Sequence, residues 1–296
     1  MHQSNLRLVL AGLAVYAVWG TPQATLVYLV LGLLFAFWFW WASAGMPIRR
    51  KARSIHAKIS LDATKVQKYI DEKRKTTRQH ITITHVVGKA LGLALRNAPG
   101  LNGRIVFDRF LPFKTIDISF LAMVEGGKNL AKVKVSNIDK KGVDQVATEL
   151  DAGSQRLRKG TDENFKKSMG PLKLLPTWLI RLVVNTAAYA AGALGLSIPA
   201  LGVEPHPFGS CIITSVGMLG VDEAFAPFTP FARVPLLVLI GAIHEGVKVE
   251  DGETKVTKKL KLCCTIDHRF LDGAQGGAMA KVLRDVFDNP SMLDQE

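Results

Sequence analysis

The stretch Asp267-His268-Arg269-Phe270-Leu271-Asp272-Gly273 joins two runs of different character near the end of the 296-residue chain. The run before it, 259–266, is strand-like, and the run after it, 278–287, is helix-like. An aspartate at position 272 can cap that helix. The stretch therefore predicts a strand-to-helix turn that carries a histidine, and such connections are where functional side chains often lie.

The chain upstream of this turn alternates between strand and helix patterns, which indicates a mixed α+β domain. We expect strands at 55–61, 103–107, 115–124, 130–135, 209–215 and 234–243, and helices starting at 62 and spanning 84–96 and 141–159.

The histidine of the turn suggests acyl transfer. Transfer from a thioester needs a base that activates the attacking group and a hydrogen-bond donor for the oxyanion of the tetrahedral intermediate. His268 is the candidate base. Asp272 is too close along the turn to be assumed as an orienting partner of the histidine, and a structural salt bridge to an arginine is an equal alternative. Gly273 is expected to permit tight packing where the strand gives way to the helix.

Several segments resemble the catalytic domain of the dihydrolipoyl acyltransferase component of 2-oxo acid dehydrogenase complexes and, more distantly, chloramphenicol acetyltransferase. The turn 267–273 matches the family pattern Asp-His-Arg-x-x-Asp-Gly. A Ser/Thr-x-x-Gly-x-x-Gly run within 208–222 and an apolar run led by Pro235 precede it, and 83–102 and 117–119 also resemble family segments. The likeness covers roughly 55–165 and 205–290.

The resemblance implies an α+β fold like that of chloramphenicol acetyltransferase, with a mixed sheet and covering helices, assembled as a homotrimer whose active sites lie between subunits. It implies that His268 removes the proton from the thiol of coenzyme A or of the acceptor. It also implies that a hydroxyl at position 214 binds the oxyanion. Thr214 stands where most relatives have serine and keeps the donor. Ser215 is the alternate donor, because a shift of one residue changes which side chain faces the site.

The N-terminus departs from the family. Residues 1–45 contain one charged side chain, Arg7, and basic residues follow closely from Arg49. The apolar runs 8–19 and 24–42 indicate a membrane-anchoring helical hairpin, and the basic residues after it place the following domain, 46–296, in the cytoplasm. We therefore expect a membrane protein with a cytoplasmic catalytic domain and membrane lipids as partners.

A second departure is a hydrophobic insertion at about 171–203, which interrupts the catalytic domain. A single crossing of the membrane here would split that domain across the bilayer. We expect an interfacial or re-entrant helical insertion with Trp178, Lys173 and Arg181 at the head-group level. A helical hairpin buried in a protein interface is the alternative.

The net charge of +13 does not by itself indicate nucleic-acid binding, because the basic residues are interleaved with acidic ones and no nucleic-acid motif is present. Lys258, Lys259 and Gly273 could contact the coenzyme, although a lysine-rich strand edge is usually only solvated. The cysteines lack the spacing of a zinc site or a disulfide framework, so we expect no metal. They are expected to be reduced core residues, with a nucleophilic role for Cys264 as a weak alternative.

The sequence thus predicts an acyltransferase of the transferase class that is membrane-anchored and uses coenzyme A or acyl-CoA as substrate. Direct transfer would proceed with His268 as base, to a thiol, hydroxyl or amine, without a covalently attached lipoyl group. One alternative is a stand-alone dihydrolipoamide acyltransferase that uses a lipoyl domain in trans. Another is a non-catalytic trimeric scaffold or subunit of a larger membrane complex.

Overall fold

The computed structural model describes residues 22–43, 54–124, 129–162, 176–229, 231–250 and 252–294. The chain divides into two compact units. One contains helix α2 (Pro22–Ser43) and the segment Pro176–Thr186. The other contains the remaining described residues and is built on a seven-stranded sheet.

The sheet is mixed, with the order β1-β9-β7-β6-β4-β5 and with β8 paired to the far part of β9. Strands β4 and β6, and β6 and β7, are parallel, and every other neighbouring pair is antiparallel. The strand bounds are Ser54–Asp62 for β1, Ile118–Val124 for β4, Asn129–Val135 for β5, Cys211–Ser215 for β6, Leu236–Ile240 for β7, His244–Glu250 for β8 and Glu253–Asp267 for β9.

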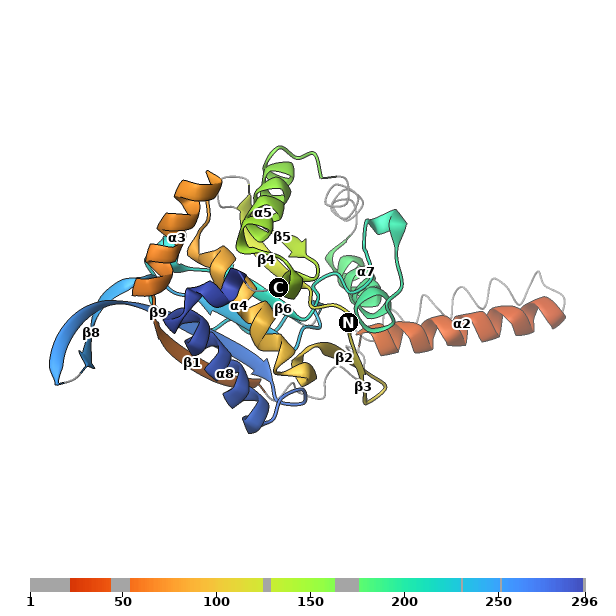
Figure 1. The fold of residues 1–296 in the computed structure, drawn as a ribbon. Helices are drawn as coiled ribbons and strands as arrows, with labels where there is room; N and C mark the ends of the chain where they lie inside the picture. The colour runs from red at the N-terminus through yellow and green to blue at the C-terminus, as the bar shows by residue number, and fades with distance from the viewer. Residues whose placement is uncertain are drawn as a thin grey trace. The chain divides into compact units, whose positions relative to one another are not determined.

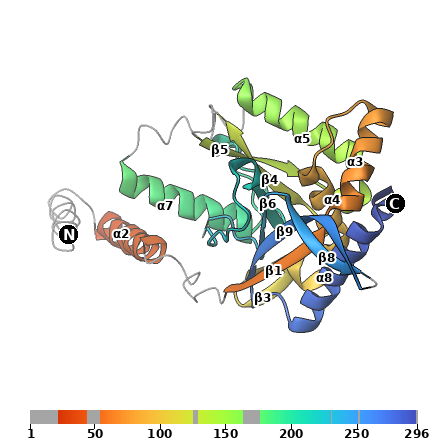
Figure 2. The same cartoon turned by 90° about the vertical axis from the view of Figure 1, so that its left-hand side faces the viewer.

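Four helices cover one face of this sheet (Figures 1 and 2). Their buried apolar side chains form the main core with inward-facing residues of the strands, because each helix places an apolar stripe against the sheet. These helices are α3 (Thr64–Thr77), α4 (Ile83–Arg96), α5 (Val143–Arg158) and α8 (Gly273–Asp288). The predicted α+β class, with a mixed sheet and covering helices, is confirmed.

A second, smaller apolar cluster lies on the other face of the sheet. It contains Ile212, Leu237, Leu239 and Cys263, and its cover comes from partly buried loop residues such as Phe208. Successive side chains of a strand point to opposite faces, so the two clusters divide the residues of β6, β7 and β9 between them.

Two hairpins extend from this framework. Strands β2 (Gly103–Val106) and β3 (Arg109–Pro112) form a separate two-stranded sheet that follows the short turn Pro99–Leu101. The hairpin of β8 and the first half of β9 reaches beyond the other strands (Figure 1).

The predicted membrane localisation is wrong. A crossing needs about 20 consecutive apolar residues in a helix. Among the residues that the structure describes, no helix is both long and apolar enough to cross a membrane. The second predicted arm, 24–42, falls within α2, and the first arm, 8–19, lies outside the described residues.

The expected insertion contains α7 (Thr177–Ala188), a π-helical turn Tyr189–Ala193 and a 3₁₀ turn Pro199–Leu201. The side chains of Ala191 and Ala193 are buried. A π-helical turn is uncommon in proteins and often marks a functional segment.

Candidate active site

The turn that carries His268 is fixed by the residues around it. Asp267, the last residue of β9, is buried, and its backbone N–H donates to the carbonyl oxygen of Pro235 at 3.0 Å. Its carboxylate accepts two hydrogen bonds from Nε of Arg269, both 3.0 Å long, and one from the backbone N–H of Arg269 at 3.1 Å. The turn therefore starts from a residue held by both the sheet and the chain that follows.

The side chain of His268 is exposed and has a defined tautomer. Its Nδ1 lies 2.8 Å from the carbonyl oxygen of Leu271. A carbonyl oxygen can only accept, so Nδ1 carries the proton and Nε2 keeps its lone pair. The Leu271 carbonyl thus orients the ring so that Nε2 can act as a base.

Asp272 supports the helix that follows. Its carboxylate accepts a hydrogen bond from the backbone N–H of Gln275 at 2.8 Å, which makes it the N-cap of α8. The predicted capping role is confirmed. The expected tight packing at Gly273 is wrong, because a Cβ at that position would have no atom within 4 Å.

A contact that sequence patterns do not reveal lies against the turn. A Cβ at Gly100 would lie 2.4 Å from the carbonyl oxygen of Phe270, and the N–H of Gly100 donates to Oε1 of Gln275 at 3.2 Å. The ring of Phe110, in the β2–β3 hairpin, packs edge-on against Phe270 with centroids 6.2 Å apart. Gly100 therefore allows the loop before β2 to pack closely against the turn that carries His268.

Thr214 and Ser215 face opposite sides of the sheet. The side chain of Thr214 has the same parity as Ile212, which belongs to the smaller cluster on the face away from the four helices. Ser215 has the parity of Ile213, which belongs to the main core. The hydroxyl at 214 is therefore the one that points away from the helix layer.

The structure does not bring Thr214 and His268 together within one chain. Thr214 is in register with Leu239 of β7, and Leu239 is in register with Cys263 of β9. His268 follows Cys263 by five residues, which corresponds to about 17 Å along the strand. The two side chains thus lie toward opposite ends of the strands.

The two lysines predicted to contact the coenzyme lie far from His268 along the chain. Lys258 and Lys259 precede His268 by nine or ten residues along β9, or about 30 Å of extended strand. Nζ of Lys259 donates to the carbonyl oxygen of Val247 at 2.7 Å within the β8–β9 hairpin. They do not line the His268 turn.

The cysteines are buried, as expected. Burial raises the pKa of the Cys264 thiol to about 12, and burial also raises the pKa values of Cys211 and Cys263. A thiol that resists ionisation is a poor nucleophile, so none of the three cysteines is suited to covalent catalysis.

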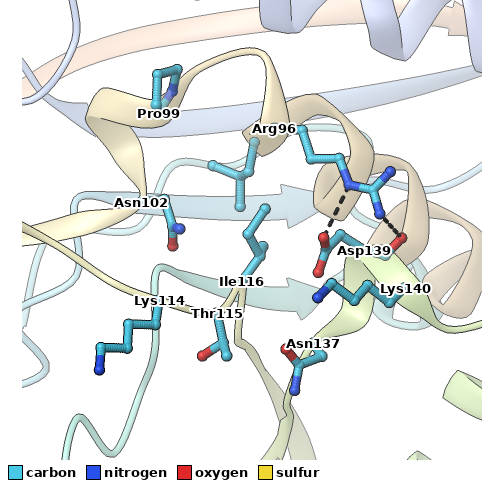
Figure 3. Close-up of a pocket in the computed structure, with 10 residues that line it drawn as sticks. Arg96, Pro99, Asn102, Lys114, Thr115, Ile116, Asn137, Asp139 and Lys140 are labelled. Carbon is cyan, nitrogen blue, oxygen red and sulfur yellow. Dashed lines mark hydrogen bonds and ion pairs between the residues drawn. The ribbon is translucent and has the colours of Figure 1, made fainter.

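A pocket of about 260 Å³ lies beside the Pro99–Leu101 turn (Figure 3). Arg96 donates to Oδ2 of Asp139 at 3.0 Å, and the buried Lys89 donates to the Asp139 carbonyl oxygen at 2.8 Å. Burial lowers the pKa of Lys89. The pocket contains neither His268 nor Thr214; its lining residues are Leu95, Arg96, Pro99, Asn102, Lys114, Thr115, Ile116, Asn137, Asp139 and Lys140.

Comparison with known families identifies the class of protein that has this mixed sheet and this histidine turn. Residues 52–165 and 204–294 match the 2-oxoacid dehydrogenases acyltransferase (catalytic domain) family. The chain belongs to this family. The matched ranges leave out the hydrophobic insertion.

Among curated proteins, the dihydrolipoyllysine-residue acetyltransferase component of the pyruvate dehydrogenase complex of Bacillus subtilis is 27% identical over 228 residues. That match covers 76% of this chain and 42% of the relative, so the chain spans less than half of its length.

Two solved structures share the fold. A probable dihydrolipoamide acetyltransferase from Listeria monocytogenes has a TM-score of 0.60 at 18% identity, covering 87% of this chain and 91% of that chain. The dihydrolipoamide acetyltransferase of Azotobacter vinelandii has a TM-score of 0.61 at 16% identity, covering 83% and 86%. The Azotobacter structure was studied for the role of a serine, a histidine and an asparagine in the catalytic mechanism.

These comparisons confirm an acyltransferase family and correct one expectation. The prediction of coenzyme A as substrate with no covalently attached lipoyl group is wrong, because the relatives are named as acetyltransferases of dihydrolipoyllysine residues or of dihydrolipoamide.

Proposed function

We propose that this chain is the catalytic part of a dihydrolipoyl acyltransferase, which moves an acyl group between a dihydrolipoyl thiol and a second thiol. The observation that carries the proposal is the geometry of His268 in a chain of this family. The Leu271 carbonyl holds the proton on Nδ1, so Nε2 is available to accept the proton of a thiol.

In the proposed reaction, Nε2 of His268 takes the proton from the attacking thiol as its sulfur bonds to the thioester carbonyl carbon. The carbonyl oxygen gains the negative charge of a tetrahedral intermediate. Collapse of this intermediate breaks the original carbon–sulfur bond, and the leaving thiolate recovers the proton from Nε2. The acyl group passes directly between the two sulfurs, without a covalent acyl-enzyme.

Thr214 is the proposed donor to the oxyanion. Its hydroxyl lies on the face of the sheet that the helices leave uncovered, whereas Ser215 faces the main core. Because Thr214 and His268 lie about 17 Å apart along the strands of one chain, we propose that each site takes His268 from one subunit and Thr214 from another. The homotrimer that the family resemblance implies would supply such a pair.

The residues studied in the Azotobacter enzyme support a role for His268 and for the residue four positions after it. Its studied histidine and asparagine are four residues apart, which is the spacing between His268 and Asp272. We propose that Asp272 acts indirectly, by capping α8 and so holding the turn in place.

A direct test is to supply a separate lipoyl domain in its dihydrolipoyl form together with the acetyl thioester of N-acetylcysteamine. Mass spectrometry of the lipoyl domain should show an added acetyl group that forms at a rate proportional to the amount of this protein. The apo form of the lipoyl domain, which lacks the lipoyl group, is the matched control. No acetylation above the rate without protein would contradict the proposal and would favour a non-catalytic scaffold.

A further inference from the structure

Arg233 is a half-buried arginine with two buried donor nitrogens, Nε and Nη2. It lies in the loop before β7 with a φ of 53°, in the left-handed region that side chains other than glycine rarely adopt. Its Nε and Nη2 are buried, and within the described residues neither has a hydrogen-bond partner. Burial lowers its pKa, but an arginine side chain stays protonated in proteins. A charge held this way costs free energy unless a ligand or partner meets it.

The Nε and Nη2 atoms of an arginine side chain can together bind one carboxylate, and Arg269 shows this arrangement. Nε and Nη2 form the side of the guanidinium plane that can grip two oxygens at once. Arg269 uses the same two atoms on the carboxylate of Asp267, with Nε 3.0 Å from each oxygen. The same edge of Arg233 therefore offers a carboxylate the two donors that Asp267 receives from Arg269.

The cover over Arg233 comes from the insertion that the family match leaves out. The guanidinium carbon lies 4.8 Å from the centroid of the Tyr189 ring, and a Cβ at Gly192 would lie 3.0 Å from Cδ of Arg233. The π-helical turn that carries both residues is fastened at two points. Arg104 donates to the Ala193 carbonyl oxygen at 2.8 Å, and the N–H of His206 donates to the Ala191 carbonyl oxygen at 3.1 Å.

Arg233 also lies at the same end of the strands as His268. Pro235, two residues after Arg233, accepts the hydrogen bond of the Asp267 N–H, one residue before His268. Arg269 also lies near this end of the strands, but its charge is paired with the Asp267 carboxylate. Of the two arginines, Arg233 is therefore the one whose charge can attract an anion near the candidate base.

We propose that the Nε–Nη2 edge of Arg233 is a carboxylate-binding subsite beneath the turn Tyr189–Ala193. The turn contacts Cδ and the guanidinium carbon of Arg233, so a carboxylate bound to the Nε–Nη2 edge would lie beside the turn and would require it to move. The ligand class is a small carboxylate, or a carboxylate side chain delivered by a second copy of the chain. Carboxylate binding at Arg233 can be measured whether or not the chain transfers acyl groups, so this proposal is independent of the proposed function.

Isothermal titration calorimetry with propionate, succinate and the neutral analogue propionamide tests the subsite. The intact protein should bind the carboxylates saturably and propionamide not at all. Arg233→Gln should weaken carboxylate binding at least tenfold. Arg233→Lys should also weaken binding at least tenfold, because lysine keeps the charge but lacks the two parallel N–H donors. Arg284→Gln removes the same charge from an exposed site on α8 and should bind like the unaltered protein.

Two further readouts distinguish the source of the carboxylate. Amide hydrogen exchange in the Tyr189–Ala193 turn should change when propionate is added to the unaltered protein and not when it is added to Arg233→Gln. A carboxylate delivered by a second copy would instead appear in sedimentation velocity as weaker self-association of Arg233→Gln, with Arg284→Gln unchanged. Near-ultraviolet circular dichroism checks that the variants remain folded. Equal carboxylate binding by Arg233→Gln would overturn the proposal, as would no saturable binding together with unchanged assembly.

Discussion

Thr214 and His268 lie toward opposite ends of the strands of one sheet. Thr214 is in register with Leu239 of β7, which is in register with Cys263 of β9, and Cys263 precedes His268 by five residues. The parallel strands β6 and β7 run toward the end of the sheet where Thr214 lies. Strand β9 is antiparallel to β7 and runs toward the opposite end, where His268 follows it. A hydroxyl and an imidazole that serve one tetrahedral intermediate must approach within a few ångströms. A catalytic role for both residues therefore requires two copies of the chain.

Replacing His268 by alanine should lower kcat for acyl transfer by about 10²- to 10⁴-fold, the usual contribution of a positioned general base. The fold should persist, because Asp272 still caps α8. Steady-state acetylation of a dihydrolipoyl domain measures the effect. Lys259→Ala, a change on the distant hairpin, should keep the original rate, and a His268→Ala variant as active as Lys259→Ala would exclude the base assignment.

Thr214→Ala should lower kcat by about 10²- to 10³-fold, as expected for the loss of one oxyanion donor. Thr214→Ser retains a hydroxyl and should recover most of that rate. Ser215→Ala is the matched control, because Ser215 has the parity of the opposite face. The same kinetic assay compares the three variants. A larger loss in Ser215→Ala than in Thr214→Ala would show that the two positions had been assigned the wrong way round.

Gly100→Ala should displace the His268 turn, because the new methyl group would lie 2.4 Å from the carbonyl oxygen of Phe270. We expect lower stability and a slower kcat together. Gly273→Ala adds the same methyl group at the start of α8, where nothing lies within 4 Å, and should be tolerated. Urea unfolding and kinetics of the pair check this, and equal behaviour of the two variants would argue against support of the turn by the Pro99–Leu101 segment.

The stability of the protein should fall as the pH drops from about 6.5 to about 4, in part because of His85. Burial lowers the pKa of His85 to about 4, and Nδ1 of the ring accepts a hydrogen bond from the N–H of Thr82 at 3.1 Å. In this range the unfolded chain binds a proton on this residue and the folded chain does not, so folding loses about 2–3 kcal/mol from this group.

Urea unfolding at pH 7.5 and pH 4.5 measures this linkage. The unaltered protein should lose more stability between the two pH values than His85→Gln, which has no proton to gain but can still accept from Thr82. An equal loss in both proteins would show that the carboxylates alone account for the acid sensitivity.

Much of the framework follows from local sequence patterns. The predicted helix 84–96 is observed as Ile83–Arg96, and the predicted strand 130–135 as Asn129–Val135. Here apolar periodicity and burial agree, so the pattern is strong. The β8–β9 hairpin was missed as a pair of strands, because Glu253–Asp267 begins with exposed polar residues that lack an apolar alternation.

The candidate site could be predicted only in part. The His268 turn and its Asp272 cap are local, and the motif was sufficient to find them. The distance between Thr214 and His268 depends on strand register across three strands, which no local pattern encodes. Arg233 was missed for the same reason: its unused edge exists only where the insertion folds back over the loop before β7. The apolar run 24–42 correctly predicted a helix, α2, but among the described residues no helix is long and apolar enough to cross a membrane.

Subunit complementation is the most direct test of a site shared between copies. His268→Ala and Thr214→Ala chains are unfolded together, mixed in equal amounts, refolded and assayed for acetylation of the dihydrolipoyl domain. Each variant alone should be nearly inactive. Random mixing in a closed ring should restore about one quarter of the unaltered activity, because one site in four receives both an intact His268 and an intact Thr214. If the mixed protein assembles fully and stays as inactive as its parents, the two residues do not form a site between subunits.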